Sequence, residues 1–334
     1  MKSFLVTIMT LSIVFYSCSN QSSKKDTKPV KIIFDTDMGP DYDDVGALAF
    51  LNAMADSGRA EILATVASNK HELVAPSINV INTYFGRSEL PVGAPKSPGV
   101  DLGSSQHWAD SIVEKYPHSI KSTSETVDAV DIYRKILNDE PDHSVTIITV
   151  GFLTNLSNLL ISKPDNNSNL SGKELVARKV KRLVSMAGRF PEGREFNIFK
   201  DSTASKFVFE NWPGEVIFSG FEIGAQIHTG LKLIKSDIKN SPVKDVFRIS
   251  IPLSEEDKGG RMSWDETAVL IGVYGTDGFF DTVRGQIIVN ADGSNTWKDD
   301  TDGKQSYVKQ KMPVPEISSF IEARMMHVPF KVKK

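Results

Sequence analysis

The chain has 334 residues, of which 40% are hydrophobic and 24% are charged, so it contains enough apolar sequence for a large core. Its formal net charge of −3 argues against a general affinity for nucleic acid or for an anionic membrane surface. After residue 30, no apolar stretch is long enough to span a bilayer.

The N-terminal segment has the pattern of an export signal. A positive start is followed by an almost uncharged apolar run over residues 4–16 and then by a polar segment. Cys18 is the only cysteine, which excludes an internal disulfide, and Phe15-Tyr16-Ser17-Cys18 resembles a bacterial lipobox that has Phe where Leu is usual. We expect residues 1–18 to be a signal peptide, with the exported protein lipid-anchored at Cys18 in the periplasm or cell envelope and residues 19–29 as a flexible tether. Ordinary signal peptidase cleavage that discards Cys18 is the alternative.

Strand and helix patterns alternate through the rest of the chain. In chain order, strands are predicted at 30–34, 61–66, 90–93, 144–149, 180–186 and 215–219, followed by a hairpin of 282–290 and 306–312 around Asp292-Gly293. Helices are predicted at 44–55, 72–85, 126–138, 153–161, 202–210, 266–274 and 316–326, with a mobile, partly helical loop at 101–123 and a polar loop at 166–171. This alternation is typical of βαβ units, so we expect one α/β domain over residues 30–330, with a Rossmann-like, mostly parallel sheet flanked by helices.

The most unusual segment follows the first predicted strand. Asp35-Thr36-Asp37-Met38-Gly39-Pro40-Asp41-Tyr42-Asp43-Asp44 holds five carboxylates in ten residues. Carboxylates this close repel one another, and some would take up protons unless a cation neutralised them. Oxygen ligands suit hard divalent cations, so the segment predicts a Ca²⁺ or Mg²⁺ site. It also falls at the carboxyl end of a strand, where ligands collect in open α/β sheets.

Three later segments are polar where a predicted strand ends or a helix begins. They are Ser68-Asn69, the stretch 188–197, and Ser263-Trp264-Asp265-Glu266-Thr267. Loops after several strands commonly build one pocket, so these segments are candidates for the site of the aspartates. Taken singly, Asn69 could be a turn residue, Asp265 a helix N-cap, and Glu195 and Asn197 solvated loop residues.

Taken in order, these segments resemble the inosine–uridine nucleoside hydrolase family. The opening Asp-Thr-Asp-x-Gly…Asp-Asp is the most specific of them. Gly151-Phe152-Leu153-Thr154-Asn155 is similar to the family's Gly-x-Leu-Thr-Asn segment, and Glu195-Phe196-Asn197-Ile198 is similar to its Glu-Phe-Asn motif. The resemblance runs from about Lys31 to the C-terminal helix. It implies the nucleoside hydrolase fold and Ca²⁺-dependent hydrolysis of ribonucleosides to ribose and a free base. We also expect a homo-oligomer, either a dimer or a tetramer.

The resemblance further assigns roles to individual residues. The metal ligands would be Asp37, Asp44, Asp265 and the backbone carbonyl of Val150, with Asp37 also acting as the general base. The substrate contacts would be Asp43 and Asn197 at the ribose hydroxyls, Glu195 at the ribose 5′ side, Asn69 elsewhere in the pocket, and Trp264 at the base. Asp35 would support the metal loop from behind.

The chain departs from the family pattern at the metal loop and at the base. The loop is two residues longer than the Asp-x-Asp-Pro-Gly-x-Asp-Asp form, which makes Asp41 an extra carboxylate. We align Asp43-Asp44 with the paired aspartates because Ala47-Leu48-Ala49 follows as a helix. Trp264 stands where some members have a His that protonates the leaving base. It resembles purine-specific members, in which the ring stacks on the base, so we expect purines to be preferred.

Several features near the base and the 5′ side have more than one interpretation. Trp264 could instead be a packing residue at the start of a helix. Trp108 or His107 could close the other side of the base from the predicted mobile loop. Arg189 and Arg194 suggest that a negative or more polar 5′ group would be tolerated.

Two other functions match parts of the sequence. A haloacid-dehalogenase-type phosphatase also begins with an apolar strand and Asp-x-Asp, but it has Thr or Val where this chain has Gly39, and its later Lys and paired-Asp motifs are not evident. A non-catalytic ribose- or sugar-binding lipoprotein on the same fold is the second alternative, because the position of the leaving-group acid is altered. Asp37, Asp44 and the Glu-Phe-Asn motif favour the hydrolase.

Overall fold

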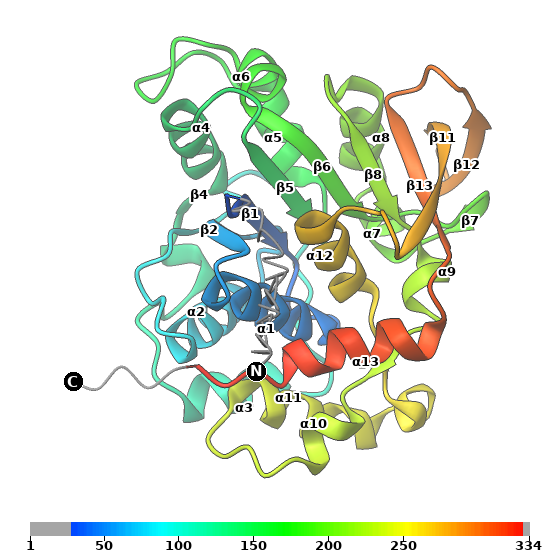
Figure 1. Ribbon diagram of the computed structural model, residues 1–334. Helices are drawn as coiled ribbons and strands as arrows, with labels where there is room; N and C mark the ends of the chain where they lie inside the picture. Colours follow the sequence, from blue (N-terminus) through cyan, green and yellow to red (C-terminus); the bar gives the residue numbers. More distant parts are fainter. Residues whose placement is uncertain (1–27, 330–334) are drawn as a thin grey trace, which may run out of the picture.

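The computed structural model describes residues 28–329 (Figure 1). The predicted signal peptide and lipobox of residues 1–18, and most of the predicted tether of residues 19–29, lie outside the described residues. Within residues 28–329, every helix is too short or too polar to cross a membrane.

Strands and helices alternate along this range, as the sequence pattern predicts. The strands are β1 Val30–Thr36, β2 Ala60–Ala67, β3 Val92–Ala94, β4 Val127–Asp128, β5 Val145–Thr149, β6 Val180–Met186, β7 Glu192–Arg194, β8 Val216–Ser219, β9 His228–Thr229, β10 Arg261–Met262, β11 Phe280–Val289, β12 Ser294–Asp299 and β13 Gln305–Gln310. The helices are α1 Asp43–Asp56, α2 Val74–Tyr84, α3 Trp108–Lys115, α4 Ala129–Asp139, α5 Thr154–Ile161, α6 Gly172–Lys179, α7 Phe196–Lys200, α8 Ser202–Asn211, α9 Phe221–Gly224, α10 Leu231–Lys235, α11 Pro242–Ser250, α12 Trp264–Tyr274 and α13 Val314–Met325. Short 3₁₀ turns lie at η1 Thr123–Glu125, η2 Ile251–Leu253 and η3 Glu256–Gly259.

One large sheet runs through the molecule, with its 11 strands in the order β4-β3-β2-β1-β5-β6-β8-β13-β11-β12-β7. The strands from β4 to β13 in this order are parallel, and β11, β12 and β7 extend the sheet in antiparallel fashion. The predicted mostly parallel α/β architecture is therefore confirmed. β2 lies on one side of β1 and β5 lies on the other, so the strand order reverses direction at β1. This reversal of strand order is where open α/β sheets bind ligands, at the carboxyl ends of the strands.

Helices cover both faces of the sheet and bury two apolar cores (Figure 1). Residues of α1, α2, α12 and α13 belong to one core, and residues of α4, α5, α6 and α8 belong to the other. Along β1, Ile32 and Phe34 point into the first core while Ile33 points into the second, because successive side chains of a strand alternate between faces. A strand buried on both sides carries consecutive apolar residues, as β1 does at 32–34, β5 at 147–148 and β6 at 183–184, and these segments made the strands recognisable in the sequence.

The C-terminal hairpin differs from its prediction. The turn at Asp292-Gly293 joins β11 to β12, and β12 lies between β11 and β7. β13 pairs antiparallel with β11 and parallel with β8. The sequence of β12, Ser-Asn-Thr-Trp-Lys-Asp, is mostly polar because the strand lies next to the sheet edge and is only partly buried, so it lacked an apolar pattern.

The predicted loop at 101–123 contains α3, which packs against α2 and α11. Trp108 begins this helix and is fully buried in the first core, so the expectation that it could close over the base is wrong. The segment between β8 and α12, for which no elements were predicted, contains three short helices, two 3₁₀ turns and the strand pair β9–β10. This segment places Arg261 at the functional site.

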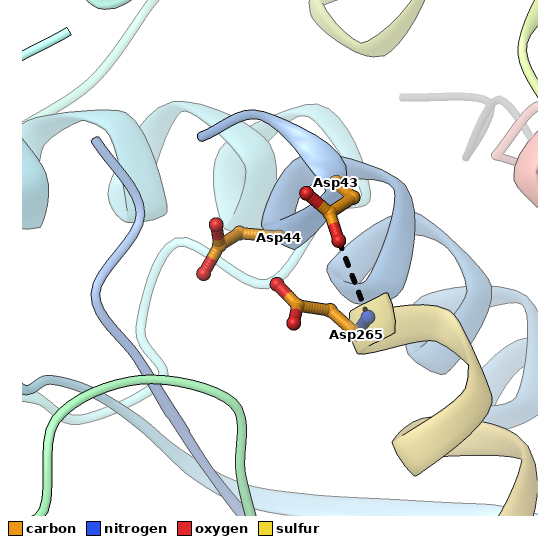
Figure 2. A group of neighbouring side chains, drawn as sticks. All are labelled: Asp43, Asp44 and Asp265. Atoms are coloured by element: carbon orange, nitrogen blue, oxygen red, sulfur yellow. Dashed lines mark hydrogen bonds between the residues drawn. The ribbon is translucent and has the colours of Figure 1, made fainter. Parts of the chain in front are cut away.

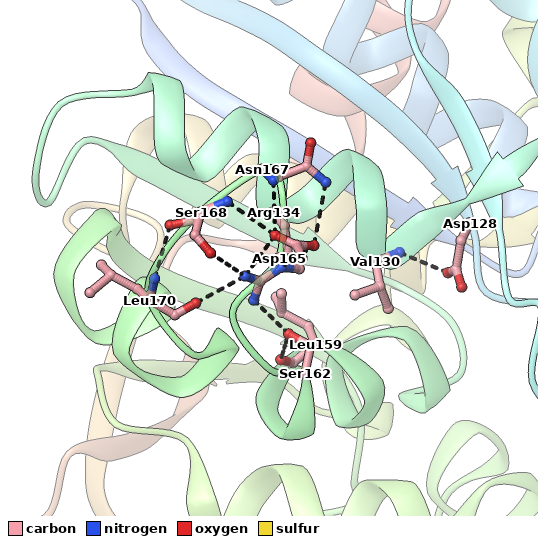
Figure 3. Close-up of polar contacts among 9 residues, drawn as sticks. All are labelled: Asp128, Val130, Arg134, Leu159, Ser162, Asp165, Asn167, Ser168 and Leu170. Carbon is pink, nitrogen blue, oxygen red and sulfur yellow. Dashed lines mark hydrogen bonds and ion pairs between the residues drawn. The ribbon is translucent and has the colours of Figure 1, made fainter.

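A polar network fixes the loop between α5 and α6 (Figure 3). The buried guanidinium of Arg134, on α4, donates to both carboxylate oxygens of Asp165 at 2.8 and 2.9 Å. It also donates to the hydroxyl of Ser162 and to the carbonyls of Ser168 and Leu170. The hydrogen bond from Arg134 lowers the pKa of Asp165 to about 2. One arginine therefore holds a loop that has no secondary structure of its own.

Candidate active site

A pocket opens at the carboxyl ends of the central strands. It is lined by Asp37, Asp41, Asp43, Asp44, Val150, Met186, Glu195, Phe196, Asn197, Phe221, Trp264 and Asp265. Its empty volume is about 420 Å³, including the part open to solvent, which suits a small molecule. Except for Asn69, every predicted metal-binding or substrate-binding residue lines this pocket. The lining combines carboxylates with three aromatic side chains, so a polar and an aromatic part of one ligand can be held together.

Three carboxylates converge from the starts of two helices (Figure 2). Asp43 and Asp44 lie in the first turn of α1, and Asp265 lies in the first turn of α12. One carboxylate oxygen from each residue lies within 4.8 Å of the others. The positive ends of the helix dipoles favour negative charge at both places. Asp37 lines the same pocket without belonging to this close group.

The pKa values of the clustered carboxylates are raised above their ordinary range. Burial and, after it, the charge of Asp43 raise the pKa of Asp44 to about 8, although a hydrogen bond from the Thr36 hydroxyl opposes the shift. Burial and neighbouring carboxylates also raise the pKa values of Asp37 and Asp265 well above their ordinary range. Carboxylates in this situation either hold protons or bind a cation. An acidic, all-oxygen donor set fits Ca²⁺, the predicted metal.

Asn69 lies behind Asp37 and does not line the pocket. Its amide nitrogen donates to the carbonyls of Asp37 at 3.0 Å and Leu102 at 2.7 Å. Its amide oxygen accepts hydrogen bonds from the backbone N–H groups of His71 and Leu102. The bond to His71 closes an Asx turn, so the interpretation of Asn69 as a turn residue is confirmed. In this position Asn69 braces the peptide that carries Asp37.

The side chain of Asp35 lies on the opposite face of β1 from that of Thr36, which contacts Asp44. Its carboxylate accepts hydrogen bonds from the hydroxyl of Tyr133 at 2.8 Å and the amide of Asn155 at 3.1 Å. Burial raises the pKa of Asp35 to about 7, and these hydrogen bonds oppose the shift. Its backbone carbonyl accepts from the N–H of Val150 at 2.8 Å. Asp35 therefore connects β1 to β5 through its backbone, and to α4 and α5 through its side chain.

Glu195 and Asn197 are buried and hydrogen-bonded, so their interpretation as solvated loop residues is wrong. The Glu195 carboxylate accepts from the N–H groups of Gly188, Asn197 and Ile198 at 3.1, 2.7 and 3.1 Å, which caps α7. The Asn197 amide nitrogen donates to the Val150 carbonyl at 3.0 Å. Asn197 therefore holds the carbonyl that the family resemblance implies as a metal ligand.

Trp264 packs against the protein and also faces the pocket. Its indole N–H donates to the Phe221 carbonyl at 2.8 Å, and the two rings lie 5.2 Å apart, centre to centre. The packing interpretation is therefore confirmed, and the pocket-facing surface of the ring remains available to a ligand. Ser263, and not Asp265, is the N-cap residue of α12. His107 is 80% exposed and lies outside the pocket lining.

Arg261 is the residue that sequence reasoning missed. Its Nη2 lies 2.7 Å from Asp43 and 3.1 Å from Asp41, and its Nη1 lies 3.8 Å from Asp257. The guanidinium carbon is 5.0 Å from the centre of the Trp264 ring, and only 8% of the side chain is exposed. Nothing in the sequence linked this arginine to aspartates more than 200 residues earlier. The acidic site therefore includes one positively charged side chain, the guanidinium of Arg261, at its edge.

Helices α1 and α12 approach each other closely at Gly46. A Cβ atom at this position would lie 2.1 Å from Oε1 of Glu266, whose side chain is fully buried. Any residue larger than glycine would therefore force a rearrangement. The glycine lies in the helix that supplies Asp43 and Asp44, and Glu266 lies in the helix that supplies Asp265.

Comparison with known proteins gives a consistent result. The sequence pattern of the family described as "Inosine-uridine preferring nucleoside hydrolase" matches residues 32–311. The chain is 27% identical over 208 residues to the pyrimidine-specific ribonucleoside hydrolase RihA of Citrobacter koseri, covering 59% of this chain and 62% of that protein. It is 26% identical over 195 residues to the inosine-uridine preferring nucleoside hydrolase of Leishmania major, covering 55% of this chain and 58% of that protein. The matches thus span about 60% of the length of these relatives.

Solved structures show the same fold at low identity. The purine-preferring ribonucleoside hydrolase from Gardnerella vaginalis superimposes with a TM-score of 0.69 at 17% identity, covering 89% of this chain and 98% of that chain. The inosine-uridine preferring nucleoside hydrolase from Bacillus anthracis gives a TM-score of 0.66 at 17% identity, covering 89% and 99% of the two chains.

Proposed function

This chain belongs to the inosine-uridine preferring nucleoside hydrolase family, and on that basis we propose that it hydrolyses the N-glycosidic bond of ribonucleosides with the help of Ca²⁺ and prefers purines. The observation that carries the proposal is the pocket itself. Buried carboxylates from the loop after β1, from α1 and from α12 meet there beside three aromatic side chains. Such a pocket offers oxygen ligands for a cation, acceptors for sugar hydroxyls and flat surfaces for a base.

The metal-binding residues would be Asp37, Asp44, Asp265 and the carbonyl of Val150. A Ca²⁺ bound by these residues would supply positive charge that lowers the pKa of a nearby water. Asp43 belongs to the group of three close carboxylates, but it is already paired with Arg261. Asn197 would hold the Val150 carbonyl in place through the 3.0 Å hydrogen bond.

Asp37 would be the general base of the reaction. It takes a proton from the attacking water as the water oxygen bonds to C1′ of ribose and the bond from C1′ to the base nitrogen breaks. The base leaves with the electron pair of that bond and takes up a proton. Positive charge develops on the sugar in the transition state, as in glycoside hydrolysis generally. Carboxylates fixed around the sugar stabilise that charge without having to reorganise.

The preference for purines rests on the aromatic part of the lining, since relatives include both pyrimidine-specific and purine-preferring hydrolases. Trp264, Phe221 and Phe196 line the pocket. A two-ring base gains more contact from such surfaces than a one-ring base. Trp264 stands at the position where some family members have a protonating His. Stacking on its ring would help the base to leave.

We further propose that the protein is exported, that it is lipid-anchored at Cys18, and that it acts as a homo-oligomer. The export proposal is supported by the positive start, the apolar run and the lone cysteine of residues 1–18. Globomycin treatment of producing cells would test the anchor, because lipidated and unlipidated precursors migrate differently. An unchanged pattern would contradict lipidation.

The decisive experiment is a nucleoside panel assayed for free ribose, with and without a chelator. We expect ribose release from inosine, guanosine and adenosine that stops on chelation and returns with Ca²⁺. Absence of ribose from every nucleoside, with ribose binding retained, would instead identify a binding protein. Phosphate release from nucleotides would identify a phosphatase.

A further inference from the structure

We propose that Asp41, and not Asp43, is the carboxylate that binds the sugar hydroxyls in this pocket, and that Arg261 is the positioning residue that holds it there. This inference rests on the proposed function and assigns a residue to its sugar subsite. It transfers to Asp41, the extra carboxylate of the loop, the ribose contact that the family resemblance implies for Asp43.

Both carboxylate oxygens of Asp43 already accept hydrogen bonds from the protein. Its Oδ1 accepts two hydrogen bonds from Arg261, from Nη2 at 2.7 Å and from Nε at 3.1 Å. Its Oδ2 accepts the backbone N–H of Asp265 at 3.3 Å, the contact drawn in Figure 2. The side chain is only 2% exposed. A carboxylate that is buried and engaged at both oxygens serves to join α1, α12 and β10, and a sugar hydroxyl would have to displace one of these partners.

Asp41 has the opposite environment. It lines the same pocket, and its side chain is 52% exposed. Its Oδ1 lies 3.1 Å from Nη2 of Arg261, while its Oδ2 has no hydrogen bond or ion pair within the described residues. The ion pair restrains the side chain, and the second oxygen remains free to accept a hydrogen bond from a hydroxyl. Hydrogen bonds to a charged acceptor are stronger than those between neutral groups.

The extra length of the metal loop fits this transfer of the ribose contact. Compared with the shorter family form, the loop has two additional residues, and both Asp41 and Tyr42 contact Arg261. The guanidinium lies 4.8 Å from the centre of the Tyr42 ring, and the Tyr42 hydroxyl donates to Asp257 at 2.7 Å. Asp257 in turn lies 3.8 Å from Arg261. The lengthened loop and Arg261 therefore pack together. The arginine engages the carboxylate of Asp43 in hydrogen bonds and restrains Asp41, whose second oxygen stays available to a sugar hydroxyl.

The test compares Asp41→Asn and Asp43→Asn in the full-length chain on a ribonucleoside and on its 2′-deoxy and 3′-deoxy analogues. We expect Asp41→Asn to lower kcat/KM for the ribonucleoside by about 10-fold or more, mainly through KM. Its effect should largely disappear for the analogue that lacks the contacted hydroxyl. Asp43→Asn should lower thermal stability and affect all three substrates alike. Asp237→Asn, an exposed aspartate on the surface, serves as the matched control.

The outcomes separate this inference from the proposed function. Suppose that the wild type is active, and that the discrimination between ribose and deoxyribose is lost in Asp43→Asn but kept in Asp41→Asn. This result would overturn the inference and leave the proposed function intact. A wild type that cleaves no nucleoside would remove the proposed function. Calorimetric binding of ribose and inosine then decides the inference: weaker binding by Asp41→Asn supports it, and unchanged or absent binding refutes it.

Discussion

The guanidinium of Arg261 and the carboxylate of Asp43 form a buried ion pair in which Nη2 and Nε lie 2.7 and 3.1 Å from the same oxygen. The two residues are 218 positions apart, and the pair joins the start of α1 to β10. Burying two charges is costly in itself, but removing one partner costs more, because the other charge then remains buried without compensation.

We therefore expect Arg261→Met to destabilise the protein by about 3–5 kcal/mol, since Asp43 would lose its buried partner. Urea unfolding of wild type and variant measures the difference. Arg178→Met is the matched control, because Arg178 pairs with Asp142 on the surface, where such pairs contribute roughly 0–1 kcal/mol. An Arg261→Met protein as stable as the control would show that the pair does not hold the two elements together.

Asp37→Asn should lower kcat by about 100-fold or more, because the amide cannot accept the proton of the attacking water. The side chain keeps its size, so the folded state should be retained, which circular dichroism can verify. Asp237→Asn should have unchanged kinetics, since this exposed aspartate lies outside the pocket lining. Full activity of Asp37→Asn would refute its role as the base.

Removal of Ca²⁺ should lower the stability of the protein as well as its activity. Burial and, after it, the charges of neighbouring carboxylates raise the pKa values of Asp37, Asp44 and Asp265, and a bound cation would offset both effects. At a Ca²⁺ concentration 100 times Kd, binding stabilises the folded state by about 2.7 kcal/mol. Thermal unfolding with EGTA and then with graded Ca²⁺ measures this effect. A Tm that changes neither with EGTA nor with added Ca²⁺ would exclude a Ca²⁺ site.

Trp264→Ala should reduce kcat/KM for inosine by roughly 5- to 150-fold, since stacking of a base on an aromatic side chain contributes about 1–3 kcal/mol. The loss for uridine should be smaller, because its base has one ring. Trp264→Phe should recover part of the inosine activity while losing the hydrogen bond to the Phe221 carbonyl. Faster turnover of inosine by Trp264→Ala would contradict the stacking role.

The network around Arg134 predicts a dependence of stability on pH. Because the pKa of Asp165 is lowered to about 2 in the folded protein, this carboxylate contributes stability above pH 4 that is lost as the pH falls toward 2. Asp165→Asn should therefore destabilise the protein by about 1 kcal/mol or more at pH 7. The difference from wild type, followed by urea unfolding, should shrink below pH 4, with hydrolysis at pH 7 unaffected. A difference that does not vary with pH would contradict this assignment.

The sequence predicted the central fold because the strands that matter most are apolar on both faces. β1, β5 and β6 are buried along most of their length, and each contains a short apolar segment, at residues 32–34, 147–148 and 183–184. β12 forms a local hairpin with β11 but is mostly polar, whereas β7 and β10 are short and pair with strands that are distant in the chain. Pairing over such distances leaves no local periodicity.

The same distinction applies to the site. The aspartates after β1 and the Glu-Phe-Asn segment were found because their residues are contiguous and follow a strand. Arg261 was missed because its partners lie in another part of the sequence. Asn69 was placed in the pocket because it follows β2, but its amide is turned away by backbone hydrogen bonds that no sequence pattern reveals.

The packing around Gly46 has a consequence for the pocket. Asp44 and Asp265 belong to different helices, so the distance between their carboxylates follows the packing of α1 against α12. A Cβ atom at Gly46 would meet the ends of the Glu266 and Met325 side chains at 2.1 and 2.8 Å. Glu266 is the neighbour of Asp265 in α12, so a substitution within the core would be transmitted to a carboxylate that lines the pocket.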